Sequence, residues 1–121
     1  MEALAQLKFL RAASRKVKLI LDLVRGQRVS RALAQLGVVP QAAARPVAKL
    51  LASALANARQ KSGAASGDDW WIARAEVGQG PRLKRSMPRA MGRATPILRP
   101  TCHIRIALSD TAPRRSPKNI L

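Results

Sequence analysis

The sequence has very few of the side chains from which catalytic and metal sites are built. Its 121 residues include one cysteine, Cys102, one histidine, His103, and six acidic residues. A single cysteine excludes an internal disulfide and any site with several cysteine ligands. On a strand, neighbouring side chains point to opposite faces, so Cys102 and His103 would not form a nucleophile–base pair. We therefore expect no enzyme, no cofactor and no metal site, with Cys102 as a small apolar filler.

Aromatic residues and long apolar runs are also scarce. Phe9, Trp70 and Trp71 are the only aromatic side chains besides His103. Proteins that bind single strands usually stack bases on aromatics, so that mode has little support here. The two tryptophans could form a stacking platform. The simpler interpretation is that one of them is buried and the other covers a sheet edge. No apolar run reaches the ~20 residues that span a bilayer. The first residues lack the layout of a signal peptide, so secretion is not expected.

Positive charge is what the sequence has in excess. Lysine and arginine total 23 against 6 acidic residues, which gives a formal charge of +17. Such a charge destabilises an isolated compact fold by self-repulsion, so a polyanionic partner that stays bound is expected. Nucleic acid is the first candidate and an anionic membrane surface is the second. Because 47% of the residues are hydrophobic, the chain is still expected to fold, as one domain with a modest core.

The clearest helix prediction covers Ser14–Arg25. Its apolar residues recur with helical spacing, at Val17, Ile20, Leu21 and Val24. Ser14 is predicted to cap the start of this helix and Gly26 to close its end. Arg15 and Lys16 fall in the first turn, where the helix dipole favours negative charge. A bound phosphate would relieve this conflict, and two solvated charges on an exposed turn are the alternative.

Two further helices are predicted before residue 62. The first covers Val29–Leu36, with Ser30 as its cap and Gly37 as its stop. The second covers Ala42–Lys61, with Pro46 in its first turn, where the missing N–H is harmless. The core-facing residues of this longer helix are predicted to be Val47, Leu50, Leu51, Ala54, Leu55 and Ala58.

Three segments alternate as strands do, namely Leu4–Arg11, Trp70–Val77 and His103–Ser109. In the first, Leu7 and Phe9 alternate with a lysine. The buried face of the second is predicted to comprise Trp71, Ala73, Ala75 and Val77. The buried face of the third is predicted to comprise Ile104, Ile106 and Leu108. The small polar residues of 62–69 indicate a surface loop.

The segment from residue 78 to residue 103 fits neither a core strand nor a helix. Its four prolines, Pro81, Pro88, Pro96 and Pro100, exclude a continuous helix and disfavour a central strand. Because two strands that can pair antiparallel flank it, we predict a long hairpin arm that projects from the body. Limbs of about ten residues would reach about 30 Å, with Gly92 supplying the turn.

The arm combines many cations with no acid. No acidic residue occurs between Val77 and Ser109, and the arm's cations are Arg82, Lys84, Arg85, Arg89, Arg93 and Arg99. The planar fork of arginine can bind two phosphate oxygens at once. Since an isolated two-stranded ribbon is marginal in water, we expect the arm to become ordered along a polyanion. A basic loop without a defined partner is the alternative.

The sequence favours recognition of folded RNA by its backbone and shape. Readers of double-stranded DNA insert a helix with polar base-reading side chains, and the basic helices here lack a clear set of these. A DNA-compacting protein remains an alternative that rests on charge alone. A membrane-active cationic protein is a further alternative. It rests on the amphipathic Ser14–Arg25 helix, a pattern that helices packed on a core share.

From about Leu7 to Asp110, the chain resembles the bacterial form of the large-subunit ribosomal protein 22 family. SRKVKLILDLVRGQRV resembles the family's first helix and the following turn, and RPVAKLLASALANA resembles its long helix. The most specific match is GPRLKRSMPRAMGRA with the following TCHI, in both order and length. The resemblance implies an α/β (α+β) fold with three helices packed on a small three-stranded antiparallel sheet and a long protruding β-hairpin. We expect one domain over residues 1–110, including the arm at 78–103, and a basic tail over 111–121.

The resemblance also implies partners. Family members bind large-subunit ribosomal RNA early in assembly and lie beside other ribosomal proteins. Their hairpin tip lines the nascent-peptide exit tunnel, and changes in the hairpin alter sensitivity to macrolide antibiotics, which act nearby. We expect these partners, no membrane and no small-molecule substrate, in a cytoplasmic ribosome or, alternatively, an organellar one.

The site residues follow from the charges together with this likeness. The expected RNA contacts are Arg15, Lys16, Lys18, Arg25, Arg28, Arg82, Lys84, Arg85, Arg89, Arg93, Arg99 and His103. By this likeness, Leu83, Lys84 and Arg85 match the stretch of the family's hairpin that is associated with macrolide resistance. The likeness also matches the tunnel-lining tip to Met87, Pro88, Arg89, Ala90, Met91, Gly92 and Arg93.

Three residues depart from the usual pattern of the family. Pro100 stands where a basic residue is usual, Cys102 where serine is usual, and Pro96 where a polar or charged residue is usual. These replacements put in question whether the second limb of the hairpin pairs regularly with the first, and they remove one phosphate contact.

Overall fold

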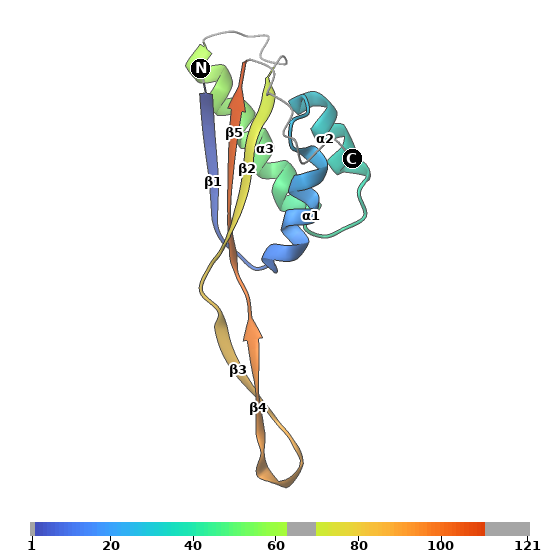
Figure 1. Cartoon of the computed structure of the whole chain (residues 1–121), viewed down its shortest axis with the longest axis vertical. Coiled ribbons are helices and arrows are strands. Elements are labelled where there is room, and N and C mark those ends of the chain that lie inside the picture. Colours follow the sequence, from blue (N-terminus) through green and yellow to red (C-terminus); the bar gives the residue numbers. More distant parts are fainter. Residues whose placement is uncertain (1, 63–69, 111–121) are drawn as a thin grey trace.

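The computed structural model describes residues 2–62 and 70–110 of the chain (Figure 1). Its elements in chain order are β1 (Glu2–Leu10), α1 (Ser14–Val24), α2 (Val29–Val38), α3 (Ala44–Ser62), β2 (Trp71–Gln79), β3 (Leu83–Pro88), a 3-10 turn (Ala90–Gly92), β4 (Ala94–Arg99) and β5 (Cys102–Ser109). The predicted α+β fold of three helices, a three-stranded antiparallel sheet and a protruding hairpin is confirmed. Most of the predicted loop (63–69) and the predicted tail (111–121) lie outside the described residues.

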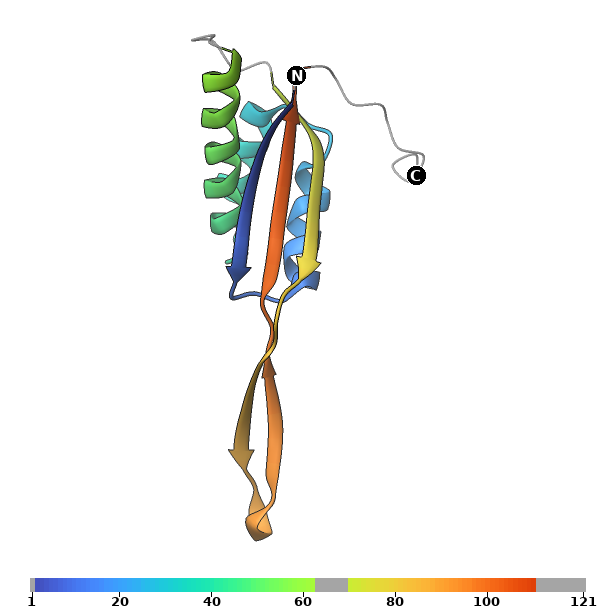
Figure 2. The same cartoon turned by 90° about the vertical axis from the view of Figure 1, so that its left-hand side faces the viewer.

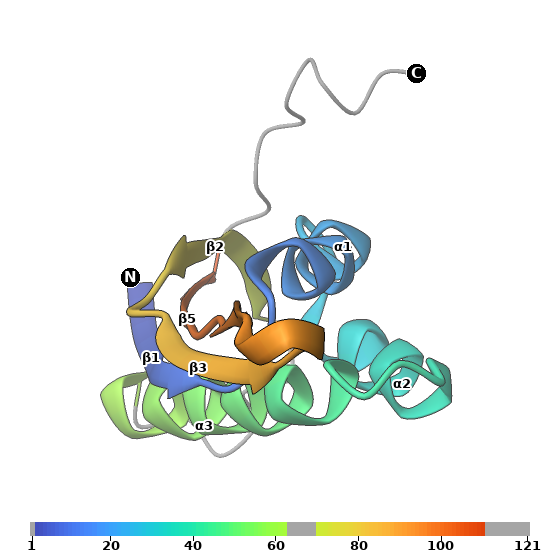
Figure 3. The same cartoon turned by 90° about the horizontal axis from the view of Figure 1, so that it is seen from below.

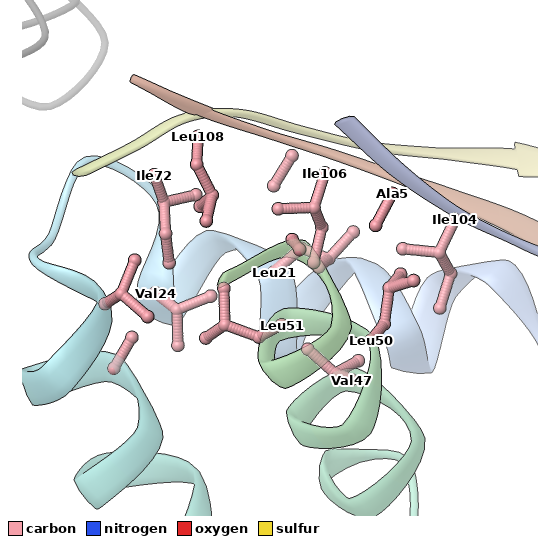
Figure 4. Packing of buried hydrophobic residues seen from close by; sticks show 14 of the residues in the cluster. Ala5, Leu21, Val24, Val47, Leu50, Leu51, Ile72, Ile104, Ile106 and Leu108 are labelled. Carbon is pink, nitrogen blue, oxygen red and sulfur yellow. The ribbon is translucent and has the colours of Figure 1, made fainter. Parts of the chain in front are cut away.

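The three helices lie on one face of the body sheet, whose strand order is β1-β5-β2 (Figure 2). Helix α3 packs against β1 and β5, α1 packs against β2, and α2 packs against α3. Figure 4 shows the core between these two layers, where residues of α1 and α3 meet residues of β2 and β5. Burial of this apolar surface is the main stabilising contribution to such a two-layer fold.

The central strand β5 matches the alternation read from the sequence. Ile104, Ile106 and Leu108 are buried and point toward the helices, as predicted. Cys102 is also buried, in agreement with its predicted role as a small apolar core residue. Burial raises the pKa of the Cys102 thiol, so the side chain stays protonated and is a poor nucleophile.

Three predicted helix-end signals are wrong, although α1 and α2 begin at the predicted residues Ser14 and Val29. Ser14 is the first helical residue of α1 and makes no capping hydrogen bond from its side chain. Helix α2 begins at Val29, one residue before the predicted cap Ser30, because Val29 is buried and its N–H donates to the Trp70 carbonyl at 3.0 Å. Gly37 does not stop α2, which continues to Val38. At the start of α2 a tertiary contact therefore overrides the local signal, and Gly37 lacks the positive φ of a glycine that ends a helix, whereas Gly26, at φ +81°, does follow α1 as predicted.

A register shift between Ile72 and Arg74 changes the predicted faces of β2. Ile72 is fully buried, whereas Trp71 and Ala73, which were predicted to share the buried face, are only half-buried. Trp70 is buried just before the strand, and Trp71 lies on the edge strand β2. The interpretation of one buried tryptophan and one covering a sheet edge is therefore confirmed.

A second irregularity, in β1, moves Phe9 out of the predicted alternation. The register of β1 against β5 shifts between Leu7 and Leu10, and Phe9 adopts φ +60°. Leu7 is half-buried against the core, but Phe9 is 62% exposed. Its expected place beside Leu7 on one face is therefore wrong, because a bulge reverses the side-chain direction that simple alternation assumes.

Both edges of the body sheet are partly closed by hydrogen bonds from the helical layer. At the β2 edge, the Gly26 N–H donates to the Ile72 carbonyl at 3.1 Å, and Arg25 Nη2 donates to the Ala75 carbonyl at 2.7 Å. At the β1 edge, Asn57 and Lys61 of α3 donate to two carbonyls of β1, each at 3.1 Å. These contacts occupy backbone groups that would otherwise invite pairing with another chain.

A short neck at residues 80–82 and 100–101 joins the body sheet to the arm (Figure 1). The Gly80 N–H donates to the Thr101 carbonyl at 2.9 Å, and the buried Thr101 hydroxyl donates to the Pro81 carbonyl at 2.6 Å. Pro81 and Pro100 have no N–H with which to continue a ladder. The neck therefore separates two ladders while a side-chain hydrogen bond keeps their connection fixed.

Gly80 is the neck residue for which a side chain has no room. A Cβ added there would lie 2.6 Å from Thr101 Oγ1 and 3.2 Å from the ring of His103. We expect Gly80→Ala to destabilise the protein by about 1–3 kcal/mol, because the methyl group must displace Thr101 or the backbone. The free energy of unfolding from urea denaturation measures this effect.

Gly78→Ala is the matched control, because a Cβ at Gly78 meets no atom within 4 Å. It should leave the stability unchanged to within about 0.5 kcal/mol, as surface substitutions usually do. Equal stabilities of the two alanine variants would contradict a tight neck.

Candidate nucleic-acid interface

The arm is a regular two-stranded ladder that stands clear of the body (Figure 1). β3 and β4 pair without a register shift, from Leu83 opposite Arg99 to Pro88 opposite Ala94. Pro96 lies within this ladder opposite Ser86, and Pro100 lies beyond its end. The two prolines therefore do not disturb the returning limb, which answers the question raised by their departure from the family pattern.

The register of the arm separates its positive charges across the strands. Each cation on β3 or β4 has an apolar residue as its cross-strand partner: Arg99 faces Leu83, Lys84 faces Leu98, and Arg85 faces Ile97. Like charges placed directly opposite each other would destabilise the ribbon, and the register avoids every such pair. Nearly all residues of the two strands are exposed, so these charges remain accessible to a polyanion.

The tip of the arm turns through two residues with positive φ, Met91 at +64° and Gly92 at +71°. The turn at Gly92 was predicted, whereas the left-handed conformation of Met91 had no sequence signal. The Arg89 N–H donates to the Arg93 carbonyl, and Arg89 Nε donates to Thr95 Oγ1 at 3.3 Å. Met91 is 96% exposed. The tip is thus a closed turn that presents one long apolar side chain between two arginines.

The start of α1 and the neck line one groove of about 320 Å³. Arg15 from α1 and Arg82 from the neck both border it, together with Ser14 and Thr101. The first turn of α1 contains no acidic residue, so its positive dipole end adds to these cations. Lys16 and Lys18 of the same helix are also exposed. The structure therefore brings together two groups of predicted contacts that are far apart in the sequence.

Three other predicted contacts already have partners within the chain. Arg25 donates to the carbonyl of Ala75 and forms an ion pair with Asp22, so it also stabilises the edge of β2. The guanidinium of Arg28 lies 5.1 Å from the ring centre of Trp71, in a cation–π contact. His103 Nδ1 accepts a hydrogen bond from the Phe9 N–H at 3.0 Å. An interface with these residues would use their remaining donors only.

Sequence reasoning missed part of the exposed charge near the neck. Lys8, Arg11 and Arg105 are exposed, and none of them was among the predicted contacts. The alternation of β5 could have identified Arg105, because it places this side chain on the face of the strand that points away from the buried Ile104 and Ile106. Lys8 could not be placed in the same way, since the bulge in β1 is not visible in the sequence.

The described parts of the chain contain no cluster of three or more His, Cys, Asp or Glu residues suited to a metal ion. Within residues 2–62 and 70–110, no helix is both long and apolar enough to cross a membrane.

Comparison with known proteins identifies the family. The family model "Ribosomal protein L22p/L17e" matches residues 5–109. The large ribosomal subunit protein uL22 of Geobacter sulfurreducens is 50% identical over 110 residues, which cover 91% of this chain and 98% of that protein. The uL22 protein of Myxococcus xanthus is 46% identical over 111 residues, covering 91% of this chain and 97% of that protein. The chain therefore belongs to the family of ribosomal protein L22p/L17e.

Proposed function

We propose that this chain is a structural, non-enzymatic constituent of the large ribosomal subunit. In this role it binds large-subunit ribosomal RNA and supports assembly, and the tip of its arm lines the nascent-peptide exit tunnel. The observation that carries the proposal is the arm itself, an exposed ribbon with six cations and no acid between residues 78 and 103. Family membership supports the large subunit as the location, because the relatives are named as large-subunit proteins.

Bound RNA would supply the stabilisation that the free arm lacks. A two-stranded ribbon is marginal in water when nothing packs against it. Leu83, Met87 and Leu98 are exposed on it, so the free arm also leaves apolar surface in water. Phosphates along both limbs would pair with the arginines and release condensed counterions, which favours binding strongly at low salt.

The groove between α1 and the neck extends this interface onto the body. Arg15 and Arg82 can hold a phosphate from two sides, and Lys16 and Lys18 continue the positive surface along α1. Arg25, Arg28 and His103 belong to the proposed interface with the donors that their internal contacts leave available. RNA would then run along the arm and across the start of α1.

The features of the tip suit a tunnel wall, in addition to the RNA contacts proposed for Arg89 and Arg93. The turn of the tip, residues 89–93, carries the exposed Met91 between Arg89 and Arg93, so an apolar group is flanked there by two cations. Such a surface can meet nascent chains of varied sequence, which we propose as its partner. The stretch from Leu83 to Arg85 and the tip would then lie where macrolides act. Neighbouring ribosomal proteins are further proposed partners.

We propose the cytoplasmic ribosome of a bacterium as the location. The relatives that match over nearly their whole length come from bacteria, among them Geobacter sulfurreducens and Myxococcus xanthus. An organellar ribosome is the alternative that the sequence left open.

Charge reversal in the limb tests RNA binding. Lys84→Glu with Arg85→Glu should weaken binding to large-subunit ribosomal RNA at least tenfold and lower the salt slope of log K by about 2, because about two phosphate contacts are lost. The control is Arg45→Glu with Lys49→Glu, the same charge change on α3, which lies on another side of the arm from α1 (Figure 3). Equal loss in both variants, or a wild-type chain absent from large subunits after sedimentation, would contradict the proposal.

A second charge reversal tests the tip. Arg89→Glu with Arg93→Glu should impair subunit assembly or translation and change macrolide sensitivity, while thermal unfolding of the body stays unchanged. Among the described residues, the hydrogen bonds of the two arginines link them to each other and to Thr95 at the turn, far from the core. Growth and drug sensitivity identical to wild type would exclude the tip from the tunnel.

Hydrogen exchange tests whether RNA orders the arm. In the free protein, amides of residues 82–99 should exchange within seconds to minutes while those of α3 stay protected, because nothing covers the arm's ladder. Addition of ribosomal RNA should slow exchange in the arm. Strong protection of the arm without RNA would show that the ribbon is stable by itself.

A further inference from the structure

A groove of about 550 Å³ lies on the face of the body sheet opposite the helices. We call this face the open face; in Figure 2 it is turned toward the viewer, and the end of β1 lies close to the start of the arm. All three strands contribute to this groove, which we call the Phe9 groove. Its principal lining residues are Lys8, Phe9, Glu76, Gly78, His103 and Arg105. Of the residues proposed above to contact RNA, His103 borders this groove, and RNA on the arm would pass it.

Phe9 is fixed as an exposed flat surface in this groove. Its N–H donates to His103 Nδ1 at 3.0 Å, and its ring meets the His103 ring edge-to-face, with the ring centres 4.9 Å apart. Its φ of +60° is rarely adopted by a bulky residue. An aromatic ring that is 62% exposed and held in an unfavourable backbone conformation suggests a binding role rather than a packing role. The preset orientation lowers the entropy lost when a ligand stacks on it.

The space beside Phe9 suits a flat ligand. Gly78, which also borders the groove, has no side chain, and an added Cβ would meet no atom within 4 Å. The strand is therefore bare where a planar ring would have to enter. Aromatic side chains that bind RNA stack unpaired bases in this manner, without a demand for one particular base.

The charges around the groove specify the ligand further. Lys8 and Arg105 are exposed cations that can contact the phosphates flanking a base. Arg105 lies directly opposite Glu76 on the neighbouring strand, and the Gln6 amide oxygen can accept from Arg105 Nε at 3.1 Å, so Arg105 would contact phosphate with its remaining donors. Glu76 is the one acid that borders the groove in the described structure, and a carboxylate there repels phosphate. A carboxylate can instead accept hydrogen bonds from the exocyclic amino group that cytosine, adenine and guanine carry, and uracil has no such group. A protein ligand is less well suited, because two of the three charges are those of a phosphate-binding surface.

We propose that the Phe9 groove binds one unpaired RNA base that has an exocyclic amino group. Phe9 stacks on the base, Glu76 accepts from its amino group, and Lys8 and Arg105 contact the flanking phosphates. His103 positions Phe9 through the hydrogen bond to its backbone. This assignment rests on the proposed RNA-binding function and adds to it a contact that depends on base identity.

Binding of short RNA strands to the full chain tests this assignment. The probes are labelled 12-nucleotide strands of oligocytidylate and oligouridylate, whose bases differ at the amino group, measured by fluorescence anisotropy over a salt series. The wild-type chain should bind oligocytidylate several-fold more tightly than oligouridylate. Phe9→Leu should weaken oligocytidylate binding about tenfold, the loss expected for one stacked base, with an unchanged salt slope because no phosphate contact is removed.

Two further variants separate stacking from base identity. Phe9→Tyr should retain wild-type binding, because tyrosine keeps the stacking ring. Glu76→Ala should bind both strands equally, with oligouridylate bound at least as tightly as by wild type, because the acceptor and its negative charge are both removed. Leu4→Ala is the matched control, an exposed apolar residue on the same face outside the Phe9 groove, and it should change neither affinity.

Three outcomes would overturn the assignment. The first is unchanged affinity of Phe9→Leu for both strands while Lys84→Glu with Arg85→Glu still weakens binding, which leaves the proposed function intact. The second is a Phe9→Leu variant that binds RNA normally but fails to enter large subunits, which would make the groove a protein contact. The third is a wild-type chain with no affinity for either strand or for ribosomal RNA, which would overturn the proposed function as well.

Discussion

The antiparallel pairing of β2 with β5 is the constraint on which the rest of the structure depends. It extends from Trp71 opposite Ser109 to Gln79 opposite Cys102, and it directs Ile104 and Ile106 into the core. The same two strands continue through the neck into the arm, so the pairing also fixes where the arm leaves the body. β1 completes the sheet on the other side of β5, and the open face that results carries the Phe9 groove.

The distribution of charge complements this framework. Ion pairs such as Glu2 with Arg74 and Asp22 with Arg25 neutralise cations of the body. The arm itself contains no acid, and it sets each strand cation opposite an apolar residue. Repulsion within the ribbon is thereby reduced without loss of positive charge. Because the same cations repel one another in the free arm and attract RNA phosphates, binding of RNA should also stabilise the arm.

Periodicity predicted the three helices and the core face of β5, because each extends over several residues that share one pattern. The arm was predicted from its prolines, its charge and the two strands that flank it. The local capping signals failed at Ser30, because Val29 before it is buried and donates to Trp70, and at Gly37, which stays within the helix. Periodicity itself failed at Phe9 and Trp71, since bulges depend on pairing between distant strands. The arm's cations were visible in the sequence, but their apolar partners and the internal contacts of Arg25 and Arg28 required the register and the fold.

The neck has a mechanical consequence. Both limbs of the arm leave the body from neighbouring strands, so tension on the tip pulls β2 and β5 in the same direction and does not slide them past each other. The load passes instead to the ladder between β5 and β1, along the strand axis, and to the helices packed beneath. In this shear geometry many hydrogen bonds share the load at once, whereas unzipping would break them one by one. The body can therefore resist unfolding when force acts on the exposed turn at Met91.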